Sequence, residues 1–215
     1  MSKDFYLSEP DRTLPLIFPT LDLLSNYLTW RRILPRVSVN GGLMVDVGAC
    51  VGGFSLAYRD IYTSPIHALE PWPDCWTYLE HNLCNSNVTI HKLGAFNRHV
   101  QMSMFVNTIG HTSLTHIEAE SREVDLVPLD DLITDSVDVL KIDAEGSERR
   151  VLEGARRILD KDKPDLIVEH LLAKEDNFDH QKDSLFVMID SYGYGRGKHI
   201  VGNDYYFRNP ARYNE

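Results

Sequence analysis

Acidic side chains follow several short apolar runs in this sequence. Asp46 precedes a glycine-rich segment, Glu70 follows the run IHAL, and Asp143 follows the run VDVLKI. If these runs are parallel strands, their acids collect at one edge of the sheet, where α/β proteins bind ligands. A carboxylate at that edge can accept hydrogen bonds from a ligand or take up a proton. We therefore expect a binding and catalytic site at the strand ends.

The segment LMVDVGACVGGFSLAYRD (43–60) is typical of a strand, a glycine turn and a helix. Glycine lets the backbone approach a ligand closely, although a tight turn without a ligand would have the same pattern. The segment lacks the second glycine of a dinucleotide fingerprint. A cofactor without phosphate, such as S-adenosylmethionine, fits this loop better. The candidate cofactor contacts here are Asp46, Gly48, Ala49, Cys50, Gly52, Gly53 and Phe54.

Glu70 lies in the stretch HALEPWPD, at the end of the expected second strand. A carboxylate in that position can accept hydrogen bonds from both ribose hydroxyls of a nucleoside. Trp72 could lie against an adenine face, with Pro71 beside it. The alternative is a solvated strand end, but the glycine segment and Glu70 together favour a nucleoside cofactor.

The candidate catalytic residues are Asp143 and Glu145 of KIDAEG, and Glu169 and His170 of LIVEHL. Acids that leave buried strands are costly to desolvate unless they serve a site. The alternatives are a surface turn, in which Glu145 and Glu148 favour a helix N-terminus, and a structural Glu–His pair.

Apolar runs alternate with helical stretches along most of the chain. This order predicts an α/β fold with a doubly wound, mostly parallel sheet covered on both faces. Residues 1–215 are expected to form one domain, with a helical and irregular cap over 1–40 and a Rossmann-like core over 41–208. The expected strands are Leu43–Val47, Ile66–Leu69, Val88–Leu93, Val137–Ile142, Leu166–Val168 and Tyr205–Phe207. The expected helices are 21–34, Gly53–Ile61, Asp74–Cys84, Ser147–Leu159 with Ser147 as N-cap, and about His180–Tyr192.

One long insertion interrupts this alternation. The run Val100–Val106 has the pattern of a half-exposed strand, and a polar loop separates it from an extended run at Val124–Pro128. Long loops in such places often cover binding sites. We expect GHTSLTH (110–116) to be a substrate lid, with His111, Ser113 and His116 as acceptor contacts, although solvated loop histidines are common.

Composition limits the class of protein and its partners. The chain has 215 residues, a formal net charge of −10 and no basic stripe, so neither nucleic acid nor an anionic membrane is an expected partner. The cysteines Cys50, Cys75 and Cys84 lack a C-x-x-C pair and are expected to be free thiols in a reducing compartment. The sequence has the pattern of neither a signal peptide nor a membrane span, so we expect a soluble, cytoplasmic protein that acts on a small-molecule or glycan acceptor.

At this point the sequence resembles the FkbM-type family of S-adenosylmethionine-dependent O-methyltransferases, over roughly residues 43–208. The matching segments are VDVGACVGGFS, HALEPWPDCWTYLEHNL, VTIHKLGAFNRHVQMSMFV, the GHTSL loop, VDLVPLDDLI, VDVLKIDAEGSERRVLEGARRIL and LIVEHL. The KIDxEG segment before a VLxGA helix is the most specific of them. Many relatives carry an asparagine where Cys50 stands, and an A-x-S-D-like turn in place of residues 95–98.

The resemblance implies a seven-stranded, Rossmann-like methyltransferase fold with an inserted lid or hairpin. It implies a hydroxyl acceptor on a sugar, a glycan or a polyketide-type natural product. By motif match, the cofactor would be held by Asp46, Gly48, Gly52 and Glu70, with Ala95 near the adenine, and the acceptor would be bordered by Asp143, Glu145 and Glu169. A nicotinamide oxidoreductase is disfavoured by the loop, and a binding module without catalysis by the retained acids.

Methyl transfer to a neutral hydroxyl needs a base that takes the proton as the new bond forms. Asp143 is the first candidate for that base, and His170 and His111 come next. A divalent cation held by Asp143 and Glu169 could instead lower the pKa of the hydroxyl. The acceptor and the oligomeric state are not predicted.

Overall fold

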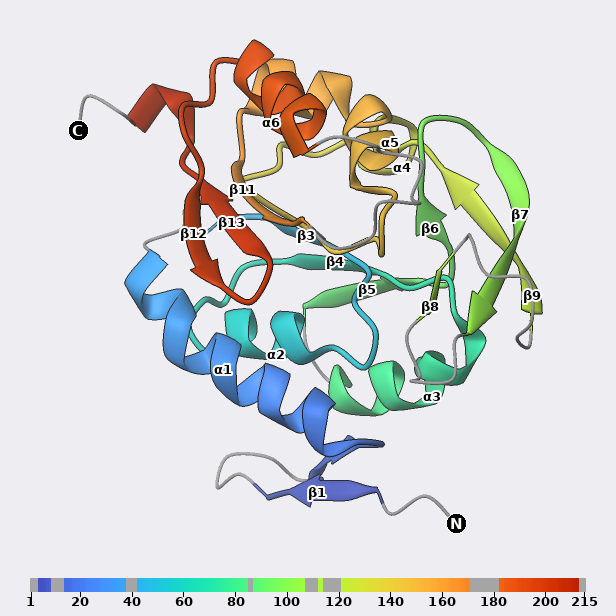
Figure 1. Ribbon diagram of the computed structural model, residues 1–215. Coiled ribbons are helices and arrows are strands. Elements are labelled where there is room, and N and C mark those ends of the chain that lie inside the picture. Colours follow the sequence, from blue (N-terminus) through green and yellow to red (C-terminus); the bar gives the residue numbers. More distant parts are fainter. Residues whose placement is uncertain are drawn as a thin grey trace.

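A seven-stranded sheet forms the centre of the computed structural model (Figure 1). The structure describes residues 4–8, 14–37, 42–84, 87–106, 112–113, 121–170 and 182–212. The strands, in spatial order, are β12 (Lys198–Val201), β13 (Asp204–Phe207), β11 (Asp165–Glu169), β10 (Val139–Ile142), β3 (Met44–Val47), β4 (Ile66–Leu69) and β5 (Val88–His91).

The pairing confirms the predicted doubly wound, mostly parallel sheet. Strands β11, β10, β3, β4 and β5 run parallel, whereas β13 is antiparallel to both β11 and β12. Strand β12 was not expected, because its sequence KHIV is short and half-exposed. The central strands β3 and β10 are buried along their whole length, as continuous apolar runs in parallel sheets usually are.

Helices cover both faces of the sheet (Figure 1). One face carries α1 (Leu21–Val37), α2 (Gly53–Arg59) and α3 (Pro73–Asn82), and the other carries α4 (Leu129–Leu132), α5 (Glu148–Glu153) and α6 (Lys182–Ser191). A separate hydrophobic cluster lies on each face; one contains Phe54 and Leu79, and the other Val151 and Leu185. No helix of the described residues is long and apolar enough to cross a membrane.

The predicted helix Ser147–Leu159 is wrong in its length. Helix α5 ends at Glu153, and a π-helical turn spans Ile158–Asp162. Gly154 stands at the break as the C-cap of α5, and only glycine fits there, because a Cβ atom would lie 2.0 Å from the carbonyl oxygen of Phe96. Asp130 caps the second segment, because its carboxylate accepts the backbone N–H groups of residues 157 and 158.

Ser147 occupies the N-cap position of α5, but its side chain makes no capping hydrogen bond. The carboxylate of Glu148 instead accepts the backbone N–H groups of Ala144 and Gly146, at 3.2 and 2.8 Å. An acid in the first helical turn therefore holds the preceding turn in place, and the predicted capping by the Ser147 side chain is absent.

The insertion between β5 and β10 forms a second sheet beside the first. Its four strands, in the order β6-β9-β7-β8, are β6 (Gly94–Ala95), β9 (Ser121–Val127), β7 (Val100–Val106) and β8 (Thr112–Ser113). The two long strands, β7 and β9, agree with the predicted extended runs. Ser113 pairs with Phe105 in this sheet, whereas His111 and His116 lie outside the described residues, so the lid stays a prediction.

The N-terminal segment was expected to be irregular, but β1 (Phe5–Leu7) and β2 (Leu16–Phe18) form an antiparallel pair. The side chain of Asn82 joins β2 to the rest of the protein. It accepts the N–H of Ile17 at 2.8 Å and donates to the carbonyl oxygens of Ile17 and Val51, each at 2.9 Å. Because Val51 lies in the glycine segment, Asn82 holds β2 and that segment together.

Replacing Asn82 with leucine should destabilise the fold. Asn82 is 1% exposed, and the variant would leave backbone groups of Ile17 and Val51 without their partner. Each buried unsatisfied group costs about 1–3 kcal/mol, so the free energy of unfolding in urea should fall by roughly 3 kcal/mol or more. The control is Asn87→Leu, because Asn87 is exposed and its side chain donates to the carbonyl oxygen of Thr63 at 3.3 Å. Equal effects of the two substitutions would contradict this role of Asn82.

Candidate active site

The glycine segment turns sharply between β3 and α2. Gly48 and Gly52 have φ values of 77° and 89°, and Cys50 has the left-handed value of 51°. At Gly48 a Cβ atom would lie 1.8 Å from the carbonyl oxygen of Asp143. Only glycine therefore lets the loop lie this close to the end of β10.

Beneath this loop, Asp46 is fully buried and binds other protein groups. One carboxylate oxygen accepts the hydroxyl of Ser55 at 2.7 Å, and the other lies 3.5 Å from the Lys141 ammonium. Asp46 does not line the cavity described below. Asp46 therefore holds the start of α2 through Ser55, and it stabilises the charged form of Lys141.

Glu70 follows β4 and lies beside the glycine loop. Its two carboxylate oxygens accept the backbone N–H groups of Cys50 and Trp72, each at 2.7 Å. Burial raises the pKa of Glu70 to about 7, although both N–H groups and Lys141 act to lower it. Each oxygen keeps a further lone pair, so Glu70 can still accept hydrogen bonds from a ligand.

The carboxyl end of β10 carries a buried lysine, which the sequence analysis did not single out. The Lys141 ammonium lies 3.2 Å from Asp143 Oδ2 and 3.4 Å from the Gly48 carbonyl oxygen, and the residue is 4% exposed. Burial disfavours its charge, but Asp143 and Asp46 outweigh burial and raise the pKa of Lys141. Lys141 is therefore a fixed positive charge among carboxylates.

Two further carboxyl groups face Asp143 from β11 and β13. Glu169 and Asp204 are register partners in these strands. Burial, with Asp143 next in effect, raises the pKa of Glu169 to about 10 and that of Asp204 to about 7. The raised pKa favours the protonated form of Glu169, and the Lys141 ammonium at 3.2 Å favours a carboxylate at Asp143. We name Lys141, Asp46, Asp143, Glu169 and Asp204 the charge cluster.

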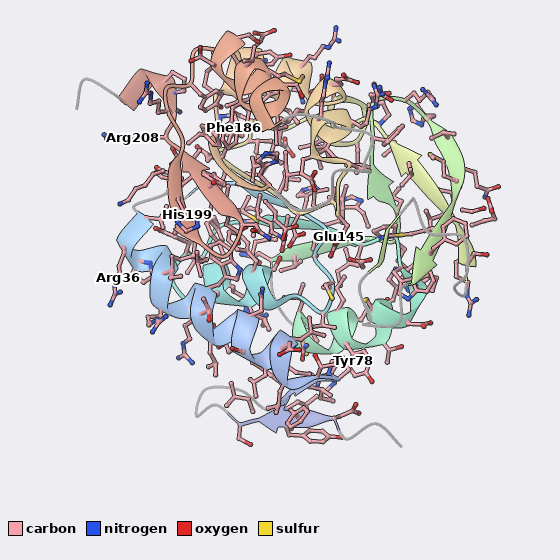
Figure 2. The ribbon with its side chains drawn as sticks, in the orientation of Figure 1. Arg36, Tyr78, Glu145, Phe186, His199 and Arg208 are labelled. Carbon is pink, nitrogen blue, oxygen red and sulfur yellow. The ribbon has the colours of Figure 1, made fainter. Side chains whose placement is uncertain are left out.

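After Asp143 the chain makes a left-handed turn, with φ of 50° at Glu145 and 100° at Gly146. A residue other than glycine in this region is strained, and such strain often accompanies functional sites. Figure 2 shows Glu145 in the middle of the molecule, near the strand ends. Its side chain contributes to the wall of the cavity.

A cavity of about 550 Å³ lies at these strand ends, a volume within the usual range for small-ligand sites. Its wall contains most of the predicted site residues: Gly48, Ala49, Cys50, Gly53, Phe54, Glu70, Pro71, Trp72, Ala95, Asp143, Glu145 and Glu169. Gly52 does not line it, and the predicted acceptor contacts of the lid loop are not among the residues whose side chains are described.

His170 was a candidate base, but it does not line the cavity. Its ring is buried and packs on Phe186 of α6, with the ring centroids 5.2 Å apart. Figure 2 shows Phe186 on the side of the sheet that α6 covers. Successive side chains of a strand point in opposite directions, so Glu169 faces the cavity and His170 faces α6.

Other elements complete the wall in ways that the sequence did not reveal. Helix α1 and the turn before it contribute Pro19, Thr20, Asp22, Leu23 and Asn26, helix α3 contributes Tyr78, and the second sheet contributes Met104 and Leu126. In the sequence, Lys141 stands out as the one charged residue of the apolar run VLKI, whereas no pattern distinguishes Asp204 as a site residue.

The predicted divalent cation gains no support from the side chains. Within the described ranges, no group of three or more His, Cys, Asp or Glu residues is arranged to hold a metal ion. Lys141 already supplies a positive charge next to Asp143.

Comparison with protein families gave one match over most of the chain. The model of the methyltransferase FkbM domain matches residues 46–195. No curated protein matches the sequence significantly.

Solved structures with the same fold include an FkbM methyltransferase from Methylobacillus flagellatus and fibrillarin from Aeropyrum pernix. The first is 23% identical with a TM-score of 0.62, and the match covers 83% of this chain but 47% of that one. This chain therefore spans about half of that relative's length. Fibrillarin, determined with natively bound S-adenosylmethionine, is 13% identical with a TM-score of 0.52, over 83% of this chain and 76% of its own. At these identities the likeness concerns the fold.

Four buried carboxyl groups with raised pKa values should make the stability of the fold decrease as the pH rises. The folded protein keeps a proton on Glu169 up to about pH 10, and on Glu70, Glu148 and Asp204 up to about pH 7, whereas the unfolded chain releases these protons near pH 4–5. Since the folded state binds more protons in this window, the free energy of unfolding should decrease from pH 5 to pH 9.

Glu169→Gln should reduce this decrease, because glutamine has no proton to lose and fills the same space. Urea unfolding at a series of pH values measures the slope, and Glu80→Gln is the control, since Glu80 is about half-exposed. A slope for Glu169→Gln as steep as that of the wild type would contradict the protonated state of Glu169.

Proposed function

The chain belongs to the FkbM methyltransferase family, and on that premise we propose that it transfers a methyl group from S-adenosylmethionine to a hydroxyl group of a sugar or glycan. The observation that carries the proposal is one cavity that joins the glycine loop and Glu70 to Asp143. The residues proposed to bind the nucleoside and the candidate base, Asp143, thus line the same cavity.

The residues present fit S-adenosylmethionine. Glu70 is a buried carboxylate in the cavity wall whose oxygens can accept hydrogen bonds from ribose hydroxyls. Trp72 and Ala95 form an apolar part of the wall that suits a base ring. The carboxylates at the strand ends suit a cationic sulfonium group, and the loop lacks the glycine pattern that cradles a pyrophosphate.

When bound, this cofactor supplies a methyl group activated by the positive sulfonium charge. The protein has to hold the acceptor oxygen in line with that group and remove its proton. Asp143 is the group best suited to accept the proton. It lines the cavity, and Lys141 stabilises its carboxylate form at 3.2 Å.

Glu169 has a different role in this proposal. Because its pKa is raised to about 10, it is protonated and does not compete with Asp143 as a base. As a protonated carboxyl it can donate a hydrogen bond, to Asp143 or to the acceptor. Glu145 borders the same part of the cavity and can accept a hydrogen bond from another hydroxyl of the acceptor.

A sugar or glycan acceptor is supported by the carboxyl groups of Asp143, Glu145 and Glu169 in the cavity wall, which can form hydrogen bonds with several hydroxyl groups. A large apolar acceptor of the polyketide type would have to desolvate these groups. The test is incubation with methyl-labelled S-adenosylmethionine and a panel of monosaccharides, oligosaccharides and macrolide alcohols. Label in the macrolides alone would reject the sugar acceptor.

Glu70→Ala should weaken S-adenosylmethionine binding at least about tenfold, because hydrogen bonds to a charged group contribute roughly 1.5–3 kcal/mol each. Calorimetry measures the dissociation constant, and thermal unfolding verifies that the variant is folded. The control is Glu80→Ala, since Glu80 lies on α3 and pairs with Lys92 at the surface. A folded Glu70→Ala protein with unchanged affinity would place the ribose elsewhere.

Asp143→Asn should lower the rate of methyl transfer by about 10²–10⁴-fold, since asparagine cannot accept the proton. The affinity for S-adenosylmethionine should change little, because Glu70 and the glycine loop provide that binding. Single-turnover transfer to the acceptor found in the panel measures the rate, and Asp131→Asn serves as the control, as Asp131 is exposed and pairs with His99. Turnover of Asp143→Asn within about threefold of wild type would exclude Asp143 as the base.

A second experiment tests the divalent cation. If a chelator inactivates the wild type and a divalent cation restores its activity, the cation mechanism replaces the mechanism with Asp143 as the base.

A further inference from the structure

Two cysteines form a thiol pair in the wall of the cavity. The Sγ atoms of Cys50 and Cys75 lie 3.8 Å apart, and both residues are half-buried free thiols. Cys50 belongs to the glycine loop and Cys75 to the first turn of α3, and both line the cavity. A small solute in the cavity can therefore reach both sulfur atoms.

The pair joins the two chain segments that hold Glu70. The N–H of Cys50 donates to one Glu70 oxygen, and the N–H of Trp72 donates to the other. The N–H of Cys75 in turn donates to the carbonyl oxygen of Trp72 at 3.2 Å. A covalent bond between the sulfurs would therefore pull on both sides of the carboxylate that is proposed to bind the ribose.

We propose that Cys50 and Cys75 are a modification site, at which a peroxide converts the two thiols to a disulfide and lowers the affinity of the cavity for its cofactor. The second part rests on the proposed function, because S-adenosylmethionine is the ligand whose affinity changes. Cys84 cannot form a second site of this kind, because it is exposed and has no cysteine partner among the described residues.

The chemistry needs only the two thiols and a peroxide. The sulfur of one cysteine attacks a peroxide oxygen, the O–O bond breaks, and a sulfenic acid forms with release of water or an alcohol. The second sulfur displaces the sulfenic hydroxyl, which leaves as water, and the S–S bond forms. The two thiols lose two electrons and two protons in all, and the peroxide is reduced.

Either thiol can begin the sequence, because either sulfur can be the donor in the contact between Cys50 and Cys75. The hydrogen bond with Cys50, together with burial, raises the pKa of the Cys75 thiol. Whichever sulfur attacks the peroxide as a thiolate, the other lies 3.8 Å away and can resolve the sulfenic acid.

Disulfide formation requires local movement at the cofactor loop. The sulfurs must approach by about 1.8 Å, because an S–S bond is about 2.05 Å long. The loop has little freedom to follow, since Cys50 already has a left-handed backbone and Gly52 fits closely against Leu79 and Leu83. The movement should therefore change the position of the Cys50 N–H relative to Glu70 and narrow the cavity.

The experiment uses the full chain carrying Cys84→Ser, so that only the pair can react. The protein is treated with hydrogen peroxide and quenched, its peptides are mapped by mass spectrometry without reduction, and its affinity for S-adenosylmethionine is measured by calorimetry. We expect a Cys50–Cys75 linked peptide and an affinity at least about tenfold weaker, a loss of about 1.4 kcal/mol, that dithiothreitol restores. Circular dichroism verifies that the oxidised protein stays folded.

Cys75→Ser in the same background is the matched control. Its Cys50 can still be oxidised to a sulfenic acid, but no disulfide can form, so peroxide should leave its affinity within about twofold of its untreated value. An equal loss of affinity in this variant would overturn the role of the pair and assign the effect to Cys50 alone. A linked peptide with unchanged affinity would overturn the effect on the cofactor.

The experiment distinguishes a failure of the disulfide proposal from a failure of the proposed function. If the reduced protein does not bind S-adenosylmethionine, the proposed function fails, and the peptide map still decides whether the modification site exists. Absence of the linked peptide after peroxide treatment would overturn the site, whatever the affinity shows.

Discussion

The buried ammonium group of Lys141 is the interaction on which the arrangement of the site depends. It lies in a central strand and is 4% exposed, within 3.5 Å of carboxylate oxygens of Asp46 and Asp143. Lys141 and Asp46 would not be stable as isolated charges in this place, because desolvation of each costs several kcal/mol, whereas the Asp143 side chain is 32% exposed. Lys141 stabilises both carboxylates, and it also contacts the Gly48 carbonyl oxygen. The glycine loop, the candidate base and the strand ends are thereby fixed relative to each other.

Much of the fold follows from patterns that the sequence displays locally. The buried parallel strands are mainly apolar runs, with Asp46 in β3 and Lys141 in β10 as charged exceptions. The acids after β4 and β10 meet because parallel strands end at the same edge of a sheet. Within a strand, residues two apart share a face, which is why Lys141 accompanies Asp143. The same alternation separates Glu169 from His170, a consequence that is visible only once the end of β11 is known.

Other parts of the site depend on contacts between distant segments. Asp204 enters from the start of an antiparallel strand, where the rule for parallel strand ends does not apply. Asp22 and Asn26 reach the cavity because α1 packs across α2, and these residues precede the stretch that the family model matches. Gly154, at the division of the helix, lies close to the backbone of Phe96, which follows β6. No local pattern predicts such contacts.

The position of β13 has a consequence for biosynthesis. Ribosomes release a chain from its N-terminus, and Asp204 belongs to the last strand of the central sheet to be made. Until β13 pairs with β11, the latter strand is an open sheet edge and the carboxyl groups around Lys141 are incomplete. A nascent chain can thus form the glycine loop and β10 before Asp204 has been made, and it gains the complete charge cluster only after β13 has paired with β11. Before that, the open edge of β11 lies next to an incomplete charge cluster.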